Sequence, residues 1–483
     1  YLGFPQFRFF GQGWRIVTGK HGGEGSKGET TPFEALTTAM SGAVGTGNIG
    51  GVALAIWTGG PAAIFWMWIT AIFGMTTKFV EVTLAHKFRT TLSDGSISGG
   101  PMYYIEKGLN MKWVAILFSA LMMICAIGSG NMPQINNIAN VMETEFSVPK
   151  LMTGLVLGGL LWIIIIGGIT RIAAVASKII PIMGVIYFGG ALIVLVNNYE
   201  NIIPSFNAIF SQVFTGSAAV GGFLGASFAM SLKYGVARGL YSNEAGQGSS
   251  PIAHASSKTE KSIEQGMVSI LEPFIDTIVV CSVTAMVILS SGVWTEKFEN
   301  SFDRTSMTVI SGVYSDANED DVIELSKYVQ NMPSEITNFN GVISLEAGSI
   351  VSSNATIIHK RSVGEDVIIS RDGNLVTGDL EITNGSFVER GLNIRGKSLI
   401  DSAELTAKAF SQSSMNEYGG YLVAIALLLF AFSTAIAWCY YGDRSTAYIF
   451  GEKGVFWYRN FYVLCFILAA VIDTEVVWNL SLI

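Results

Sequence analysis

The chain has 483 residues, of which 50% are apolar and only 14% are charged, and its formal net charge is −8. A soluble protein of this size usually carries about a quarter charged residues, so the composition argues against a soluble globular protein. The 29 Lys and Arg residues are scattered along the chain, so nothing in it supports nucleic-acid binding.

Nine apolar runs are long enough to cross a hydrocarbon core, which needs roughly 20 residues. We predict membrane spans at residues 33–57, 61–85, 113–141, 151–169, 172–197, 219–241, 264–292, 418–441 and 456–472. Of the connections between the first six spans, those after the first, third and fifth span hold only one basic residue, Lys150. Basic loops face the cytoplasm, so the first span runs outward and the sixth runs inward. The sequence therefore predicts a multi-pass protein of a bacterial or archaeal plasma (inner) membrane.

Two of these spans are rich in glycine near their middle. The first contains 41–51, with five glycines beside Thr46 and Asn48, and the sixth contains 221–228. A face for close helix packing would also use glycine. However, the two spans are five apart and run in opposite directions, which is the relation expected in an inverted-repeat transporter. We therefore predict discontinuous helices in an all-α, five-plus-five inverted repeat.

A broken helix exposes polar backbone groups that can bind ions. The N–H groups that begin its outer half bind a carboxylate with help from the helix dipole. The carbonyl groups that end its inner half coordinate a sodium ion. In the first span, we expect the amides from Gly45 to Asn48 to bind a carboxylate.

Polar side chains inside the third, seventh and eighth spans are further candidates, because they are costly in a membrane. Gln134 would hydrogen-bond a substrate or join two helices. Ser433 and Thr434 suit sodium, or bond back to the carbonyls of the preceding turn. Glu272 and Asp276 lie four residues apart on one helix face, so they form a proton relay or pair with a cation such as Arg238; we prefer a structural pair.

The connection after the seventh span is long and acidic. Residues 295–417 hold 19 acidic and 10 basic residues, a net of −9, whereas the rest of the chain has a net of +1. Short alternating runs are separated by Asp372-Gly373 and Asn384-Gly385, which favour hairpins. We predict a small, mostly β insertion at 295–415, outside the cytoplasm, between transporter segments 1–294 and 416–483. Its one His, His359, accompanies no Cys and no catalytic motif, so we expect no enzyme, and its partner is unknown.

Several segments resemble the alanine/glycine:cation symporter family, the sodium:alanine symporters. They include Ala39–Val52, Gly59–Trp68, Gly235–Ser249 and Phe430–Thr434, and the resemblance covers almost the whole chain except about 300–403. It implies a leucine-transporter-like fold, alanine or glycine as substrate, and no cofactor besides sodium as the coupling cation.

The resemblance also implies site residues. It assigns Thr46 and Gly47 to the substrate carboxylate, with Gln134 as a further contact. Trp438, Phe223 and Phe228 would form the pocket wall. For sodium it implies the carbonyls of Ser41 and Val44 and the hydroxyls of Ser433 and Thr434. The loop 242–249 is cytoplasmic on this topology, so we expect a gate or packing loop that Glu244 and Arg238 latch.

Two departures from the family stand out. The family typically has eleven spans, so we expect the two missing ones beyond Tyr1 and Ile483, and its members usually have a short connection where this chain has the acidic insertion.

The function that follows is a secondary active transporter that imports alanine or glycine with sodium by alternating access, through a lipid bilayer. The alternative is a non-transporting amino-acid sensor or a sodium-independent facilitator with the same pocket.

Overall fold

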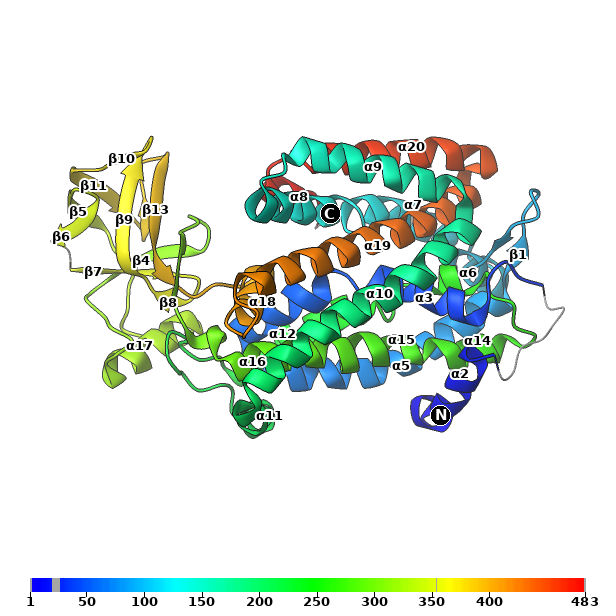
Figure 1. Ribbon diagram of the computed structural model, residues 1–483, viewed down its shortest axis with the longest axis horizontal. Helices are drawn as coiled ribbons and strands as arrows, with labels where there is room; N and C mark the ends of the chain where they lie inside the picture. Colours follow the sequence, from blue (N-terminus) through cyan, green and yellow to red (C-terminus); the bar gives the residue numbers. More distant parts are fainter. Residues whose placement is uncertain (1, 20–26, 353, 482–483) are drawn as a thin grey trace.

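The computed structural model describes residues 2–19, 27–352 and 354–481, so Tyr1 and Ile483 lie outside the described residues. A bundle of long helices and a separate β-rich unit lie side by side along the long axis (Figure 1). The N-terminal helices lie at the end of the bundle away from the β-rich unit (Figure 1).

Helices make up nearly all of the bundle. Its first half contains α1 (Pro5–Arg8), α2 (Phe10–Val17), α3 (Pro32–Ala43), the π-helical turn η1 (Gly47–Gly51), α4 (Val52–Gly59), α5 (Ala62–Lys87), α6 (Pro101–Leu109), α7 (Lys112–Gly128), α8 (Met132–Phe146), α9 (Lys150–Ile166) and α10 (Gly168–Asn197). Its second half contains α11 (Ile202–Ser211), α12 (Phe228–Asn243), α13 (Ser250–His254), α14 (Ser262–Ser269), α15 (Leu271–Pro273), the π-helical segment η3 (Phe274–Cys281), α16 (Ser282–Ser291), α18 (Ser402–Ser411), α19 (Glu417–Phe450), α20 (Glu452–Ala469) and α21 (Thr474–Ser481).

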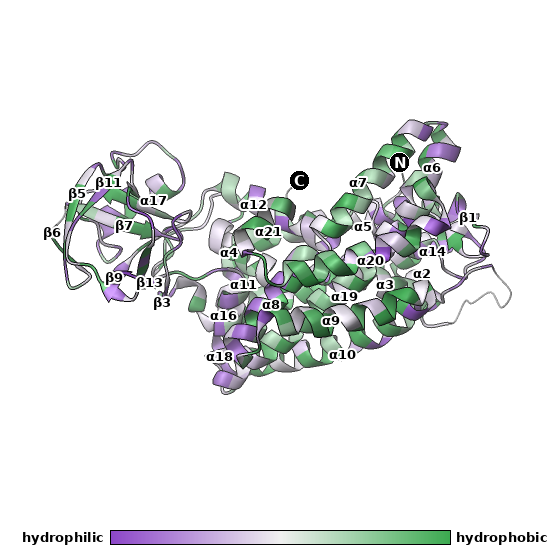
Figure 2. Cartoon of the chain, turned by 90° about the horizontal axis from the view of Figure 1, so that it is seen from above, coloured by the Kyte–Doolittle hydropathy of each residue, from purple (hydrophilic) through white to green (hydrophobic). Residues whose placement is uncertain are grey.

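Several of these helices are long and apolar enough to cross a membrane. Among the described residues these are Ala62–Lys87, Lys112–Phe146, Gly168–Asn197, Ser262–Ser291 and Glu417–Phe450, and the bent pair Pro32–Ala43 and Gly47–Gly59 makes a sixth. The fourth predicted span corresponds to α9, a shorter apolar helix, and the ninth to α20. Hydrophobic residues dominate α9, α10 and α19 (Figure 2), as expected for helices that cross a membrane.

The predicted break in the first span is confirmed. Pro32 and a capping box between Thr31 and Glu34 start α3, and the helix stops at Ala43 because Val44 has an extended backbone. The helix then resumes as η1 and α4, with a bend of 57°. The span therefore exposes carbonyl groups at the end of α3 and N–H groups at the start of η1.

The predicted position of the break in the sixth span is wrong. Gly221 and Gly225 have positive φ angles in a narrow turn closed by the bridges Ser217↔Ala226 and Val220↔Phe223, and α12 begins only after it. The glycines thus supply the left-handed backbone of a turn, and they do not interrupt a helix. Helix α12 ends at Asn243, and the next helix, α13, begins at Ser250.

The β-rich unit lies within the acidic connection. It contains α17 (Glu319–Val329) and the strands β3 (Phe298–Ser301), β4 (Met307–Ser311), β5 (Gly341–Glu346), β6 (Ser349–Ser352), β7 (Ala355–His359), β8 (Ser362–Val363), β9 (Glu365–Arg371), β10 (Asn374–Leu375), β11 (Gly378–Thr383), β12 (Ser386–Phe387) and β13 (Leu392–Ser398). One sheet has the order β12-β11-β5-β6-β9-β13-β3, with β10 on β9, and a second has the order β4-β7-β8. Asp372-Gly373 joins β9 to β10, and Asn384-Gly385 joins β11 to β12, as two-residue hairpin loops.

The insertion contacts the bundle where the first predicted span ends and the sixth begins. The Trp57 indole N–H donates to the Lys360 carbonyl at 2.9 Å, and Leu224 is buried in an apolar cluster of the insertion. Helix α18 lies inside the predicted insertion 295–415 but packs against α19 and η1. There Thr406 donates to the Ile49 carbonyl at 3.1 Å, so α18 covers the break from the side of the insertion.

Candidate functional site

A cavity of 570 Å³ lies at the break of the first span. Gly45, Thr46 and Gly47 of the break form part of its lining. The rest includes side chains of α7, α8 and α19 and the end of α12. The consecutive helices α7 and α8 and the distant helices α12 and α19 therefore meet at the point where the backbone of the first span is open.

Most of the predicted substrate residues line this cavity, but two do not. Thr46, Gly47, Gln134 and Trp438 are among its lining residues. Phe223 packs against Trp294, with ring centroids 5.2 Å apart, in a cluster near the insertion. Phe228 packs against Trp66 at 6.0 Å. Because both rings belong to the misplaced break of the sixth span, they are not part of the site.

Gln134 and Trp438 present polar groups at the cavity. The Gln134 side-chain N–H donates to the Ser129 carbonyl at 3.3 Å, and its Oε1 is buried without a hydrogen-bond partner among the described residues. The Trp438 indole N–H lies 3.3 Å from the Gly42 carbonyl and 3.2 Å from Glu244 Oε1. Gln134 thus has a free acceptor for a ligand, and Trp438 is held in place from two helices.

The predicted sodium residues lie where α3 and α19 touch. Ser41 Oγ donates to the Ser433 carbonyl at 2.8 Å, and Ser433 and Thr434 both donate to the Phe430 carbonyl, at 2.9 and 3.0 Å. The two hydroxyls thus bond back to the preceding turn, yet each oxygen keeps lone pairs for a cation. Val44 is buried beside them, and Thr434 also lines the cavity.

The loop after α12, predicted as a cytoplasmic gate or packing loop, contributes to the lining of the cavity. Glu244 and Gln247 are lining residues. Glu244 Oε2 accepts from Ser249 Oγ at 2.6 Å. Among the described residues, no hydrogen bond or ion pair joins Glu244 to Arg238. Arg238 instead lies over the Tyr241 ring, 5.9 Å from its centroid. The predicted latch between Glu244 and Arg238 is therefore absent from the described part of the chain.

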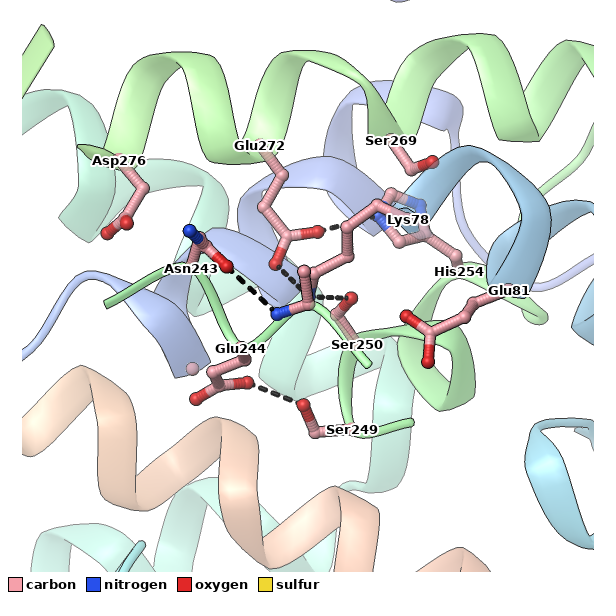
Figure 3. Close-up of polar contacts among 12 residues, drawn as sticks. Lys78, Glu81, Asn243, Glu244, Ser249, Ser250, His254, Ser269, Glu272 and Asp276 are labelled. Carbon is pink, nitrogen blue, oxygen red and sulfur yellow. Dashed lines mark hydrogen bonds and ion pairs between the residues drawn. The ribbon is translucent and has the colours of Figure 1, made fainter. Parts of the chain in front are cut away.

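Glu272 and Asp276 have separate partners, and neither of them is Arg238. Glu272 pairs with Lys78 of α5 at 3.0 Å and lies 3.5 Å from His254, and all three side chains are fully buried. Lys78 also donates to Ser250 Oγ at 2.5 Å. Figure 3 shows Glu272 and Asp276 pointing from the same helix toward this region. The buried ion pair ties α5 to the seventh span and to α13.

Asp276 joins the break of the first span to the end of α12. Its carboxylate accepts from Asn48 Nδ2 at 2.7 Å, Ser242 Oγ at 2.5 Å and Thr277 Oγ1 at 2.7 Å. Asn48 Oδ1 in turn accepts from the Gly45 N–H at 2.9 Å. Two π-helical segments, η1 and η3, therefore meet through one polar network, as is frequent at functional sites.

Sequence reasoning did not assign Lys78, Ser242 or the side chain of Asn48 to the site, and it gave Glu244 a role in a latch only. Lys78 is the one basic residue inside the second predicted span, which could have marked it as a partner for a buried acid. Asn48 and Ser242 stand within segments already noted for their glycines or motif. Their pairing across spans, however, has no signal in a single sequence.

These features define a multi-pass membrane transport protein, and comparisons with known proteins agree. The profile of the sodium:alanine symporter family matches residues 1–318 and 382–482. An uncharacterized transporter of Haemophilus influenzae is 32% identical over 481 residues, covering 99% of this chain and 83% of the relative. The sodium/alanine symporter AgcS of Methanococcus maripaludis is 34% identical over 484 residues, covering 99% and 84%.

A third relative is the probable sodium/glutamine symporter GlnT of Bacillus subtilis, 41% identical over 266 residues, which cover 55% of each chain. The extent of these matches shows that the chain belongs to the sodium:alanine symporter family. The family resemblance found in the sequence is thereby confirmed.

Proposed function

We propose that this protein imports a small neutral amino acid, alanine or glycine, together with sodium by alternating access. The observation that carries the proposal is the cavity at the broken first span, where open backbone groups of η1 meet Gln134, Thr434 and Trp438. The relative named as a sodium/alanine symporter supports alanine, whereas another is named for glutamine.

In the proposed binding mode, the substrate carboxylate lies at the start of η1. The amides of Thr46 and Gly47 are the first of that helical segment, where N–H groups lack intrahelical partners and the dipole favours an anion. Gln134 contributes its free acceptor, and Trp438 forms the wall. In this mode the Trp438 ring would limit the length of the substrate side chain.

The coupling ion would bind behind this pocket. The carbonyls of Ser41 and Val44 at the end of α3 and the hydroxyls of Ser433 and Thr434 give oxygen ligands from two helices. Each sodium ion that enters would contribute about 2.3 kcal/mol per 100 mV of membrane potential, besides its concentration gradient. Because Thr434 also lines the cavity, sodium and substrate would bind next to each other.

The charge pattern supports a place in a bacterial or archaeal inner membrane, with the insertion outside the cytoplasm. Its partner, if it has one, is not part of the proposal.

The test is uptake of labelled alanine by proteoliposomes under an inward sodium gradient, with potassium in place of sodium as the comparison. We expect uptake to require sodium and to compete with glycine. Thr434→Val removes the hydroxyl at nearly constant volume and should abolish the sodium dependence, whereas Thr434→Ser should keep it.

Other outcomes separate the alternatives. Uptake that is equal in sodium and potassium would overturn the coupling and indicate a facilitator. Alanine binding without any uptake would indicate a sensor that uses the same pocket.

A further inference from the structure

Glu244 differs in charge from every other side chain at the cavity. It is the only acidic or basic residue among the lining residues that the structure describes. Only 4% of Glu244 is exposed, and no Lys, Arg or His of the described chain lies within ion-pair distance of its carboxylate. A buried carboxylate without a counter-charge is strongly disfavoured, so a cation from outside the chain would stabilise it.

Hydrogen bonds hold the Glu244 carboxylate in place but do not use all of its acceptor positions. Oε1 accepts from the Trp438 indole at 3.2 Å, and Oε2 accepts from Ser249 Oγ at 2.6 Å. Both donors are neutral, and a carboxylate has about four acceptor positions. Each oxygen therefore keeps capacity for a charged donor from the cavity, and Figure 3 shows the carboxylate next to Ser249.

The backbone at Glu244 adds to the negative character of this wall. Glu244 follows the last residue of α12, has a left-handed backbone with φ of 53°, and donates its N–H to the Leu240 carbonyl at 3.0 Å. The C-terminal end of a helix carries partial negative charge. The conformation that ends α12 thus brings a helix C-terminus and a carboxylate to the same side of the cavity.

Another part of the lining has the opposite character. Thr46 and Gly47 stand at the N-terminal end of η1, where a helix carries partial positive charge. Both ends open into one cavity. A ligand that carries both a carboxylate and an ammonium group is complementary to this cavity, with the carboxylate at the start of η1 and the ammonium group at Glu244.

We propose that Glu244 receives the α-ammonium group of the substrate and so restricts the cavity to zwitterionic α-amino acids. This inference rests on the proposed function, because it assumes that the cavity is the substrate site. It adds a specificity-determining residue to the carboxylate site at Thr46 and Gly47.

The first test is alanine binding to purified Glu244→Gln, which keeps the shape and both hydrogen-bonding positions but removes the charge. We expect the alanine Kd to rise at least thirtyfold, since truncating one partner of a buried charged pair is costly. The matched control is Glu81→Gln. Glu81 accepts from the Gly246 N–H of the same loop at 3.1 Å but does not line the cavity, so its alanine Kd should change less than threefold.

Sodium is the competing cation, and a second readout separates the two. Thermal stabilisation of the protein by sodium without alanine should be the same in Glu244→Gln as in wild type. If the variant loses the sodium effect, the carboxylate serves the ion and the inference is overturned. An unchanged alanine Kd in the variant would also overturn it.

A measurement on the wild type covers the case in which Glu244→Gln does not fold. Propionate has the size and carboxylate of alanine but lacks the ammonium group, and we expect at least a hundredfold weaker competition with labelled alanine. Propionate that competes within tenfold of alanine would contradict a role for Glu244. If wild type takes up alanine with sodium but the Glu244→Gln result or the propionate result differs from the one expected, only this inference is overturned and the proposed function stands.

Discussion

In the helical part, Lys78, Glu272 and Asp276 are completely buried, whereas in the insertion the ion pair of Lys397 and Asp366 leaves 43% and 69% of the side chains exposed. The core of the main insertion sheet is apolar, with residues such as Ile343, Ile369 and Ile394. A folded domain normally keeps its charges at the surface. The helical part departs from this rule around its broken helices, where buried charged groups are paired or hydrogen-bonded between helices.

Irregular backbone has different causes in the two regions as well. In the insertion, Asp372 and Asn384 have left-handed φ angles followed by glycine, which is the ordinary chemistry of a two-residue hairpin loop. In the bundle, the break after Ala43 has no such local cause, and the chain around it is held by Asn48 and Asp276. Local sequence rules account for the hairpins of the insertion, while the break of the first span is also held by a polar contact with the distant residue Asp276.

The largest effect should come from Lys78→Met. It leaves Glu272 buried without its ion-pair partner, and breaking such a pair costs roughly 3–5 kcal/mol. We expect little folded protein by size-exclusion chromatography after mild heating. The double variant Lys78→Met, Glu272→Leu removes both charges and should recover most of the stability; a double variant as unstable as the single one would contradict this account.

The next effect is a pH dependence that arises in the insertion. Burial, together with the neighbouring charge of Lys360, lowers the pKa of His359 to about 3. Its Nδ1 lies 2.7 Å from Ser398 Oγ, its Nε2 accepts from the Asp303 N–H, and its ring stacks on Phe302.

The unfolded chain binds a proton at His359 near pH 6.5, whereas the folded insertion does not until about pH 3. Stability is therefore full above pH 6.5 and is lost as the pH falls, by up to about 2 kcal/mol at pH 5. Thermal unfolding of wild type and His359→Gln at pH 7.5 and pH 5 measures this effect. A wild-type loss no larger than that of the variant would refute the assignment to His359.

Substitutions of two glycines test the difference between the break of the first span and a hairpin loop of the insertion. A Cβ on Gly45 would lie 2.6 Å from Thr434 Oγ1, so Gly45→Ala should displace a proposed sodium ligand and weaken sodium dependence at least tenfold. A Cβ on Gly373 meets nothing within 4 Å, but its φ of 82° disfavours other residues. Gly373→Ala should cost about 1 kcal/mol of stability and leave uptake unchanged.

The smallest effect should follow from Lys397→Met. Its partner Asp366 lies at 2.7 Å, but the pair is exposed, and such pairs contribute little to stability. We expect the unfolding temperature to change by no more than a degree or two. A loss comparable with that of Lys78→Met would mean that burial does not distinguish the two regions.

Much of the fold could be predicted from the sequence because its signals are local. Apolar runs predicted the helical spans, and Asp-Gly and Asn-Gly predicted hairpins of the insertion. The break at Gly45–Gly51 was also visible, since glycines there combine with Thr46 and Asn48. The break of the sixth span was misplaced because glycine serves equally in a turn, as Gly221 and Gly225 do.

Only part of the site could be predicted from the sequence, because only some of its residues carry a local signal. Gln134, Thr434 and Trp438 are polar or aromatic residues in apolar spans, so each could be singled out by itself. The role of Glu244 depends on the end of α12, on Ser249 and on Trp438 of another helix, and no sequence pattern encodes that meeting. Residues whose role depends on contacts between spans needed the structure.

The most direct test of the central claim is the alanine Kd of the purified protein as sodium replaces potassium at constant ionic strength. If sodium and alanine bind side by side at the break of the first span, the Kd should fall at least tenfold from no sodium to 100 mM, which corresponds to a coupling of about 1.4 kcal/mol. The dependence should disappear in Thr434→Val. An alanine Kd that is the same in sodium and potassium would contradict the account.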